Sequence, residues 1–283
     1  MNGVFTICGT PIGNLEDMSP RALKALAEAD IVAAEDTRRT LRLLNHFNIA
    51  VRLESCHEHN EARKSDALLK RLLSGQNVTF VSDAGMPCVS DPGGFLANAC
   101  HENGIRVTAA PGPTALTTAI ALSGFDCGRF IFEGFLTLND KERAKTLDEL
   151  KNQRRAVVFY EAPHRLLRTL KDISDHFGDR MICVAREITK IHEEVLRLPA
   201  KEAVAHYERN DPRGEYVIVV KGLSASEFKK AEISRWEGVS VERHVDMYAE
   251  KGMDRKEAVK AAARDRGVSK SEVYNIMMKK RRP

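Results

Sequence analysis

The chain has 283 residues, room for about two domains, and its 43% hydrophobic and 30% charged residues are ordinary for a globular protein with sizeable cores. No apolar run approaches the roughly 20 residues of a membrane helix, and the N-terminus enters a strand-like run directly, so we expect a cytoplasmic protein without membrane association. The six cysteines are scattered, with no Cys-x-x-Cys pair and no histidine at metal-ligand spacing. This pattern predicts reduced thiols and no metal site.

The formal charge of +4 is distributed unevenly along the chain. From Asp254 to Pro283, ten Lys and Arg stand against four Asp and Glu, a net charge of +6, which leaves −2 for the residues before them. A basic C-terminal unit on a near-neutral body predicts a polyanionic partner, although a solvated tail with no partner also fits.

Short apolar runs alternate with helical periodicity over residues 1–124, which predicts an N-terminal α/β domain with a mostly parallel sheet. Its strands are expected at Val4–Cys8, Ile31–Ala34, Val51–Ser55, Val78–Val81 and Ile105–Ala109. Its helices are expected at Arg21–Ala29, Leu41–Phe47, Glu58–Leu73 and Gly93–Glu102, and a last helix follows the fifth strand and completes the domain near Gly124. Asp91 is expected to be the N-cap of the last helix, with Pro92 in its first turn.

A second α/β domain is predicted over residues 129–222. Its strands are expected at 129–135, Ala156–Tyr160, Met181–Ala185, Glu194–Leu198 and Tyr216–Val220, and its helices at Lys141–Leu150, Pro163–His176 and Ala200–Arg209. Because only about five residues join the two domains, a cleft between them is the natural place for a substrate.

Residues 223–240 are polar and are expected to form a linker or a loosely packed helix. Residues 241–283 are expected to form a basic helical module, in which a helix over Arg255–Arg266 ends at Gly267 and Ser269 caps a second helix. This order is typical of a helix-turn-helix. The second helix should turn Val273, Ile276 and Met277 inward and present Lys270, Ser271, Tyr274, Asn275 and Lys279 outward.

Three glycine- and proline-rich loops each follow a predicted strand, at residues 9–14, 81–93 and 111–115. Because the carboxyl ends of parallel strands meet at one edge of a sheet, all three loops can line one crevice. Neither a Rossmann glycine pattern nor a P-loop is present, so the ligand need not carry phosphate. We therefore expect one ligand site at this edge.

Six motifs in chain order carry a resemblance that spans residues 1–221 and continues into the helical tail. They are Gly9-Thr10-Pro11-Ile12-Gly13-Asn14-Leu15-Glu16-Asp17, Glu35-Asp36-Thr37-Arg38, Ser82-Asp83-Ala84-Gly85 with Asp91-Pro92-Gly93, Pro111-Gly112-Pro113-Thr114-Ala115, Phe132-Glu133-Gly134-Phe135, and Tyr160-Glu161-Ala162-Pro163-His164-Arg165. Together they resemble the bacterial small-subunit ribosomal RNA methyltransferase I family, within the tetrapyrrole methylase superfamily. The first loop lacks the Gly-Pro-Gly-Asp and the loop at Gly85 lacks the Gly-Asp-Pro that porphyrinoid methylases usually show, which favours the RNA branch.

The resemblance implies S-adenosylmethionine as the methyl donor, bound between two α/β domains. It also implies a homodimer that methylates the 2′-hydroxyl of a cytidine ribose in the decoding region of 16S ribosomal RNA, either as free RNA or in the small ribosomal subunit. The superfamily pattern places cofactor contacts in the three loops. In this sequence the expected contacts are Thr10, Pro11, Ala84, Gly85, Met86, Val89, Thr114 and Ala115.

Methyl transfer from a sulfonium to an alcohol is an in-line displacement, so positioning can supply much of the rate, and a general base can add about 10²–10⁴-fold. The candidate bases are Asp83, Glu161 and His164, because each lies at a strand end or in a motif that faces the expected cleft. Each also has a structural interpretation: Asp83 orients its loop, Glu161 pairs with Arg165, and His164 packs within a loop.

Cations are the candidates for contact with RNA phosphates, with local ion pairs as the alternative. They are Arg38, Arg39, Arg42, Arg165, Arg168, Arg186 and Lys190 in the body, and Lys270, Lys279 and Lys280 in the C-terminal module. Two other functions stay open: a methylase of porphyrinoid or other small molecules, and a helix-turn-helix regulator whose α/β body senses a metabolite.

Overall fold

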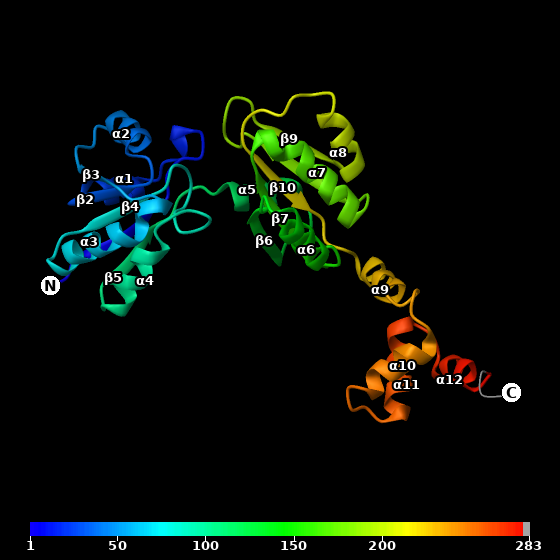
Figure 1. Cartoon of the computed structure of the whole chain (residues 1–283). Coiled ribbons are helices and arrows are strands. Elements are labelled where there is room, and N and C mark those ends of the chain that lie inside the picture. Colours follow the sequence, from blue (N-terminus) through cyan, green and yellow to red (C-terminus); the bar gives the residue numbers. More distant parts are fainter. Residues whose placement is uncertain (280–283) are drawn as a thin grey trace.

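The computed structural model describes residues 1–279. Two sheets with flanking helices are followed by a group of short helices that extends away from the second sheet (Figure 1). Within the described residues, no helix is long and apolar enough to cross a membrane. All six cysteines are free thiols, and four of them are buried.

The first sheet is parallel throughout and has the strand order β3-β2-β4-β1-β5. Its strands are β1 (Val4–Cys8), β2 (Ile31–Ala34), β3 (Arg52–Ser55), β4 (Val78–Val81) and β5 (Arg106–Ala110). β2 and β4 are buried along their whole length, as expected for parallel strands with helices on both faces. The five predicted strands are confirmed to within one residue at each end.

Four helices cover the two faces of this sheet. They are α1 (Pro20–Ala27), α2 (Thr37–His46), α3 (Glu61–Leu73) and α4 (Gly94–Glu102), with short 3-10 turns at Leu15–Asp17 and Glu58–Asn60. On one face, Leu26 of α1 and Leu44 of α2 share a core with Val32. On the other face, Leu68 of α3 and Leu96 of α4 share a core with Phe80.

The second sheet is mixed and has the strand order β6-β7-β10-β8-β9. Its strands are β6 (Phe130–Phe135), β7 (Ala156–Glu161), β8 (Met181–Arg186), β9 (Glu194–Pro199) and β10 (Tyr216–Val220). β6 and β7 are the one pair of neighbouring strands in this sheet that is parallel; β10 is antiparallel to both of its neighbours, and β9 is antiparallel to β8. The register of β6 shifts between Phe132 and Gly134.

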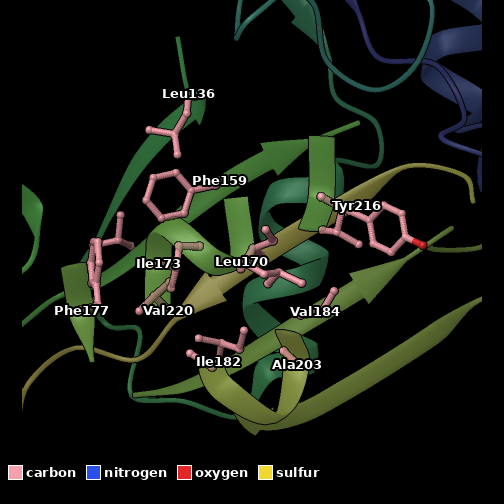
Figure 2. Packing of buried hydrophobic residues seen from close by; sticks show 14 of the residues in the cluster. Leu136, Phe159, Leu170, Ile173, Phe177, Ile182, Val184, Ala203, Tyr216 and Val220 are labelled. Atoms are coloured by element: carbon pink, nitrogen blue, oxygen red, sulfur yellow. The ribbon is translucent and has the colours of Figure 1, made fainter. Parts of the chain in front are cut away.

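One face of the second sheet is covered by three helices, α6 (Asp140–Leu150), α7 (Pro163–Phe177) and α8 (Ala200–Tyr207). Leu170 and Ile173 of α7 point into this core beside Phe159 and Val184 of the sheet (Figure 2). The helices begin and end close to the predicted positions.

The opposite face of the second sheet is covered by α5 (Ala115–Ser123), although this helix follows the last strand of the first sheet. Leu116 and Ala119 of α5 share a core with Val158 and Val217 of the second sheet. By its packing α5 therefore belongs to the second α/β unit, whereas the predicted domain limit at residue 124 assigns it to the first. The physical reason is that the apolar side chains of α5 contact the second sheet.

The C-terminal residues form the four helices α9 (Ala225–Ser234), α10 (Val241–Ala249), α11 (Arg255–Arg266) and α12 (Lys270–Lys279). α9 buries no residue, so the segment predicted as a linker or loosely packed helix is such a helix. The other three helices share a small core that includes Val245, Ala258 and Val273. We call α10 to α12 the C-terminal module.

The predicted turn between α11 and α12 is confirmed. α11 ends at Gly267, which has a left-handed backbone. The Ser269 hydroxyl accepts a hydrogen bond from the Glu272 amide, and the Glu272 carboxylate accepts one from the Ser269 amide. Val273 is buried as predicted, whereas Ile276 is 44% exposed and does not point inward, because it lines an open groove against Ile233 and Trp236 instead of entering the core.

Candidate functional site

The three glycine- and proline-rich loops meet at one edge of the first sheet, as predicted. They follow β4, β1 and β5, which are neighbours in the sheet and all run in the same direction. Thr10 and Gly85 form a β-bridge in which each amide donates to the other carbonyl, at 2.9 and 3.0 Å. A Cβ on Gly9 would lie only 2.6 Å from the Gly112 nitrogen, so the first and third loops touch through their backbones.

The loop after β4 has an unusual backbone. Gly85, Cys88, Ser90 and Gly93 all have positive φ angles, of 82°, 69°, 62° and 119°. Cys88 and Ser90 carry side chains that disfavour this conformation, at a cost of order 1–3 kcal/mol each, and such strain gathers at functional sites. The loop geometry therefore supports the choice of this loop as the core of a ligand site.

The predicted cap of the helix that follows this loop is wrong. The N-cap of α4 is Gly93, and no side chain of its own segment caps it. Instead, Oε1 of Glu61, at the start of α3, accepts hydrogen bonds from the amides of Gly93 at 2.6 Å and Phe95 at 3.2 Å. The Asp91 side chain therefore does not cap α4.

Three carboxylates gather beside this loop. Asp83 accepts a hydrogen bond from the Asp36 amide at 3.1 Å and pairs with Arg39 at 3.1 Å. Burial, together with the negative charges of Glu35 and Asp83, raises the pKa of the Asp91 carboxyl to about 6. Sequence reasoning selected Asp83 but missed Glu35 and Asp91 as members of one acidic group.

The second α/β unit reaches the same edge at several points. The Tyr160 hydroxyl, at the end of β7, accepts a hydrogen bond from the Leu116 amide at 3.1 Å, and burial raises its pKa. A Cβ on Gly134 would lie 3.3 Å from Oγ of Ser90, and a Cβ on Gly13 would lie 2.3 Å from Cγ of Lys190. The loops of the first sheet are thus in contact with β6 and with the segment after β8.

The predicted cofactor contacts differ in what they can offer a ligand. Thr10 and Gly85 are buried, and their backbone groups are used by the bridge between the loops. Pro11, Met86, Thr114 and Ala115 are half-buried, and Ala84 and Val89 are exposed. The Thr114 side chain accepts a hydrogen bond from Thr117 as the N-cap of α5.

Glu161, the last residue of β7, and His164, in the first turn of α7, lie in very different surroundings. Glu161 is buried; one of its oxygens accepts from the Ala162 amide at 2.9 Å and pairs with Arg165 at 3.3 Å, and the other accepts from the Thr169 hydroxyl. His164 is exposed. The contacts of Glu161 favour the structural interpretation, the ion pair with Arg165, over a role as a base.

The candidate RNA-binding cations of the second unit are mostly engaged by the protein itself. Arg165 donates to the Leu136 carbonyl in addition to its ion pair, and Arg168 pairs with Asp140. Arg186 donates to the Arg213 carbonyl at 2.7 Å. Lys190 pairs with Glu187 at 2.8 Å and with Glu215 at 2.9 Å.

The candidate cations of the first unit lie together on α2, next to the loops. Arg38 is 87% and Arg39 63% exposed, although they pair with Asp36 and Asp83, and Arg42 is exposed one turn further along. In the C-terminal module Lys270 is exposed. Lys279 ends α12, and its side chain, like all of Lys280, lies outside the described part of the chain.

Comparison with known proteins gives the family. The sequence profile of the tetrapyrrole (corrin/porphyrin) methylases matches residues 4–204. A ribosomal RNA small subunit methyltransferase I from Halalkalibacterium halodurans is 43% identical over 274 residues, which are 97% of this chain and 94% of the relative. A protein of the same name from Thermotoga maritima is 49% identical over 220 residues, 78% of this chain and 99% of the relative.

Solved structures give the same fold at lower identity. The methyltransferase CobJ covers 78% of this chain and 94% of its own, with a TM-score of 0.59 and 21% identity. The match to diphthine synthase covers 80% of this chain and 93% of that protein, with a TM-score of 0.59 and 16% identity. The chain therefore belongs to the ribosomal RNA small subunit methyltransferase I family, within the tetrapyrrole methylases.

Proposed function

We propose that this protein transfers a methyl group from S-adenosylmethionine to the 2′-hydroxyl of a cytidine ribose in the decoding region of 16S ribosomal RNA. The observation that carries this proposal is 43% identity over 97% of the chain to a protein named ribosomal RNA small subunit methyltransferase I. The loop geometry and the exposed arginines of α2 support it independently. We further propose that the protein acts in the cytoplasm as a homodimer.

The residues at the loop edge fit this cofactor, which supplies an electrophilic methyl group on a positively charged sulfur. The loops at residues 9–14, 82–90 and 111–115 contain no Lys or Arg, so they suit a donor without phosphate. The acidic group of Glu35, Asp83 and Asp91 complements a cation. Pro11, Met86 and Val89 offer apolar contact, and the backbone of Ala84, Thr114 and Ala115 is the proposed source of polar contacts.

Two carboxylates and one imidazole are the candidates for a base that takes the proton of the 2′-hydroxyl. Asp83 and His164 stay candidates from the sequence, and we add Asp91, since a base with a pKa near 6 is better suited to proton transfer near neutral pH than an ordinary carboxylate. Both oxygens of Glu161 already accept hydrogen bonds within the fold. Single-turnover methylation by Asp83→Asn, Asp91→Asn, His164→Gln and Glu161→Gln would separate the candidates, with an expected loss of about 10²-fold for the base.

The activity is tested by mapping 2′-O-methyl marks in 16S ribosomal RNA from cells with and without the protein. We expect one cytidine mark to disappear and to be restored by purified protein with labelled donor, on free RNA or on small subunits. Transfer of label to a porphyrinoid instead would support a small-molecule methylase. Specific DNA binding without turnover of the donor would support a regulator. Either result would overturn the proposal.

We propose that the C-terminal module strengthens RNA binding and takes no part in the chemistry. The family profile ends at residue 204, and about a fifth of this chain has no counterpart in the Thermotoga maritima relative. The module has its own core, to which Val245, Ala258 and Val273 all belong. A truncation at Asp254 would split this core, so a test of the module has to remove all three helices together.

Truncation after Ser234 removes the module as a unit. We expect donor affinity to be unchanged and the dependence of RNA affinity on salt concentration to flatten, because fewer phosphates are neutralised. Calorimetry with the donor and RNA titrations at several salt concentrations check this. A truncated protein with full RNA affinity at every salt concentration would contradict the proposed role.

A further inference from the structure

An open groove of about 950 Å³ lies at the end of the second sheet where β6 and β7 begin. Its lining includes Arg129, Arg154 and Arg155, with Leu223 and Phe228 on the side where the chain enters α9, and Asp126 as its only acidic residue. All three arginines are exposed. The lining therefore carries a net positive charge and offers three guanidinium groups to a ligand.

None of these arginines has an acidic partner within the described part of the chain. Among residues 1–279, no ion pair involves any of the three; Arg155 donates only to the Gln153 side chain, at 3.4 Å, and the guanidinium of Arg154 lies 5.9 Å from the centre of the Phe228 ring. Asp126 faces the Gly128 amide, at 3.5 Å. Elsewhere in the same unit, Arg143, Arg165 and Arg168 all pair with carboxylates.

The position of the groove links two regions that the proposed function assigns to RNA. β7 runs for six residues from Ala156 beside the groove to Glu161 near the loops, a distance of about 17 Å. On the other side, Phe228 belongs to α9, which leads into the C-terminal module. α9 lies between the second sheet and the C-terminal module (Figure 1), so a polyanion that extends from the loop edge toward the module can pass the residues that line this groove.

We propose that this groove binds the sugar–phosphate backbone of the RNA substrate, with Arg129, Arg154 and Arg155 as the phosphate ligands. The planar guanidinium fork matches phosphate oxygens, and these contacts position an RNA without reading its sequence. The open shape and single acidic residue suit an extended backbone better than a compact small molecule. This inference rests on the proposed function for the identity of the polyanion.

The test compares two variants of the full-length protein with the same loss of charge. The groove variant carries Arg129→Gln, Arg154→Gln and Arg155→Gln. The control carries Arg63→Gln, Lys70→Gln and Arg106→Gln, which are exposed residues of the first unit without ion pairs among the described residues. Affinity for 16S ribosomal RNA is measured by filter binding at several potassium chloride concentrations, with donor affinity and steady-state methylation alongside.

We expect the groove variant to lose at least tenfold in RNA affinity at 0.1 M salt and its slope of log affinity against log salt to fall by about two units, since each lost phosphate contact removes about 0.7–0.9. KM for RNA should rise while kcat and donor affinity stay unchanged. Equal RNA affinity of the two variants would overturn the assignment. So would a groove variant that loses affinity only for assembled subunits, because that result would indicate an acidic protein partner.

The same measurements separate the groove from the proposed function. A wild-type protein that binds RNA through the groove but does not methylate it would contradict the proposed function and support the groove. If the wild-type protein methylates RNA and the groove variant binds RNA as the control variant does, the result would support the proposed function and contradict the groove. If the triple variant fails to fold by urea titration, the three single variants replace it, each with an expected slope change of about 0.7–0.9.

Discussion

Arginines at the two ends of the second sheet differ in whether they pair with carboxylates of the protein. At the loop end, Arg165 is joined to the buried Glu161 and to the Leu136 carbonyl. At the far end, Arg129 and Arg154 have no carboxylate partner among the described residues. The contacts of the arginine within a recognisable motif are thus contacts of the fold, whereas the arginines that we propose as phosphate ligands lie outside any motif. A cation count alone would not separate the two roles.

The loop end also shows how one charged network supports several elements. Thr169 donates to Glu161 and accepts from Arg143 at 2.6 Å, and Arg143 pairs with Asp172. These contacts join the end of β7 to α6 and α7. Removing one member leaves a buried charge without its partner, which is far more destabilising than the loss of an exposed pair.

The largest expected effect follows from this network. Glu161→Ala should lower the free energy of unfolding by about 3–5 kcal/mol, because it leaves Thr169 without its acceptor and Arg165 without its charged partner. Urea unfolding followed by circular dichroism measures this. Glu149→Ala, which removes an exposed partner of Lys145, should change it by less than about 1 kcal/mol. A stable Glu161→Ala protein with methylation reduced about 10²-fold would instead identify Glu161 as the base.

A second prediction concerns Asp91, whose pKa is raised from 3.8 to about 6 in the fold. The folded protein holds this proton more tightly than the unfolded chain, so the favourable contribution is complete below pH 3.8 and is lost as the pH rises through about 6. Asp91→Asn should therefore be about 2–3 kcal/mol more stable than the wild type above pH 7 and similar to it near pH 4. Urea unfolding across this pH range checks it.

The matched control for this prediction is Asp175→Asn, on an exposed carboxylate of α7. It should leave the dependence of stability on pH as in the wild type. A difference between Asp91→Asn and the wild type that does not change between pH 4 and pH 8 would show that the Asp91 carboxyl is not held in its protonated form by the fold.

Local patterns were sufficient to predict most elements of the fold. β2 and β4 are continuous apolar runs bounded by turns, and the Ser269 and Glu272 spacing predicts their reciprocal hydrogen bonds. The meeting of the three loops also follows from chain order, because it needs only parallel neighbouring strands. What failed depends on contacts between segments distant in sequence. Glu61 displaces Asp91 as the cap of α4 across 32 residues of chain, and no local signal indicates this.

The sequence was sufficient to predict the position of the candidate site, but not which of its side chains are buried or paired. The motif arginines and Glu161 were chosen by sequence, yet only the packing of α6 and α7 reveals that Glu161 is buried and paired with the half-buried Arg165. The placement of α5 on the second sheet is a further case, since its apolar face fits either sheet and only the tertiary structure decides. The proposed roles of Asp83 and His164 stay predictions.

A third prediction separates backbone strain from contact with the donor. Gly85 has a φ of +82°, and a Cβ there would lie 3.4 Å from Ile12 Cγ2 and 3.5 Å from the Pro113 carbonyl oxygen. Gly85→Val should destabilise the protein by about 1–3 kcal/mol and lower donor affinity about tenfold. Gly104→Val, at a φ of +63° with open space around it, should cost stability without changing donor affinity. Calorimetric titration that gives equal affinities for both variants would remove the Gly85 loop from the site.

The smallest expected effect in stability belongs to Arg39, which is exposed yet paired with Asp83. Arg39→Gln should change the free energy of unfolding by less than about 1 kcal/mol, because water screens the pair. Its effect on RNA binding should be easier to measure, because α2 begins beside the loops. The loss of one phosphate contact should lower the slope of log RNA affinity against log salt concentration by about 0.7–0.9. Lys24→Gln, which breaks a comparable exposed pair with Glu28 on α1, is the control. If both variants bind RNA with the wild-type slope, α2 is not part of the RNA surface and its arginines, like Arg165, serve the protein alone.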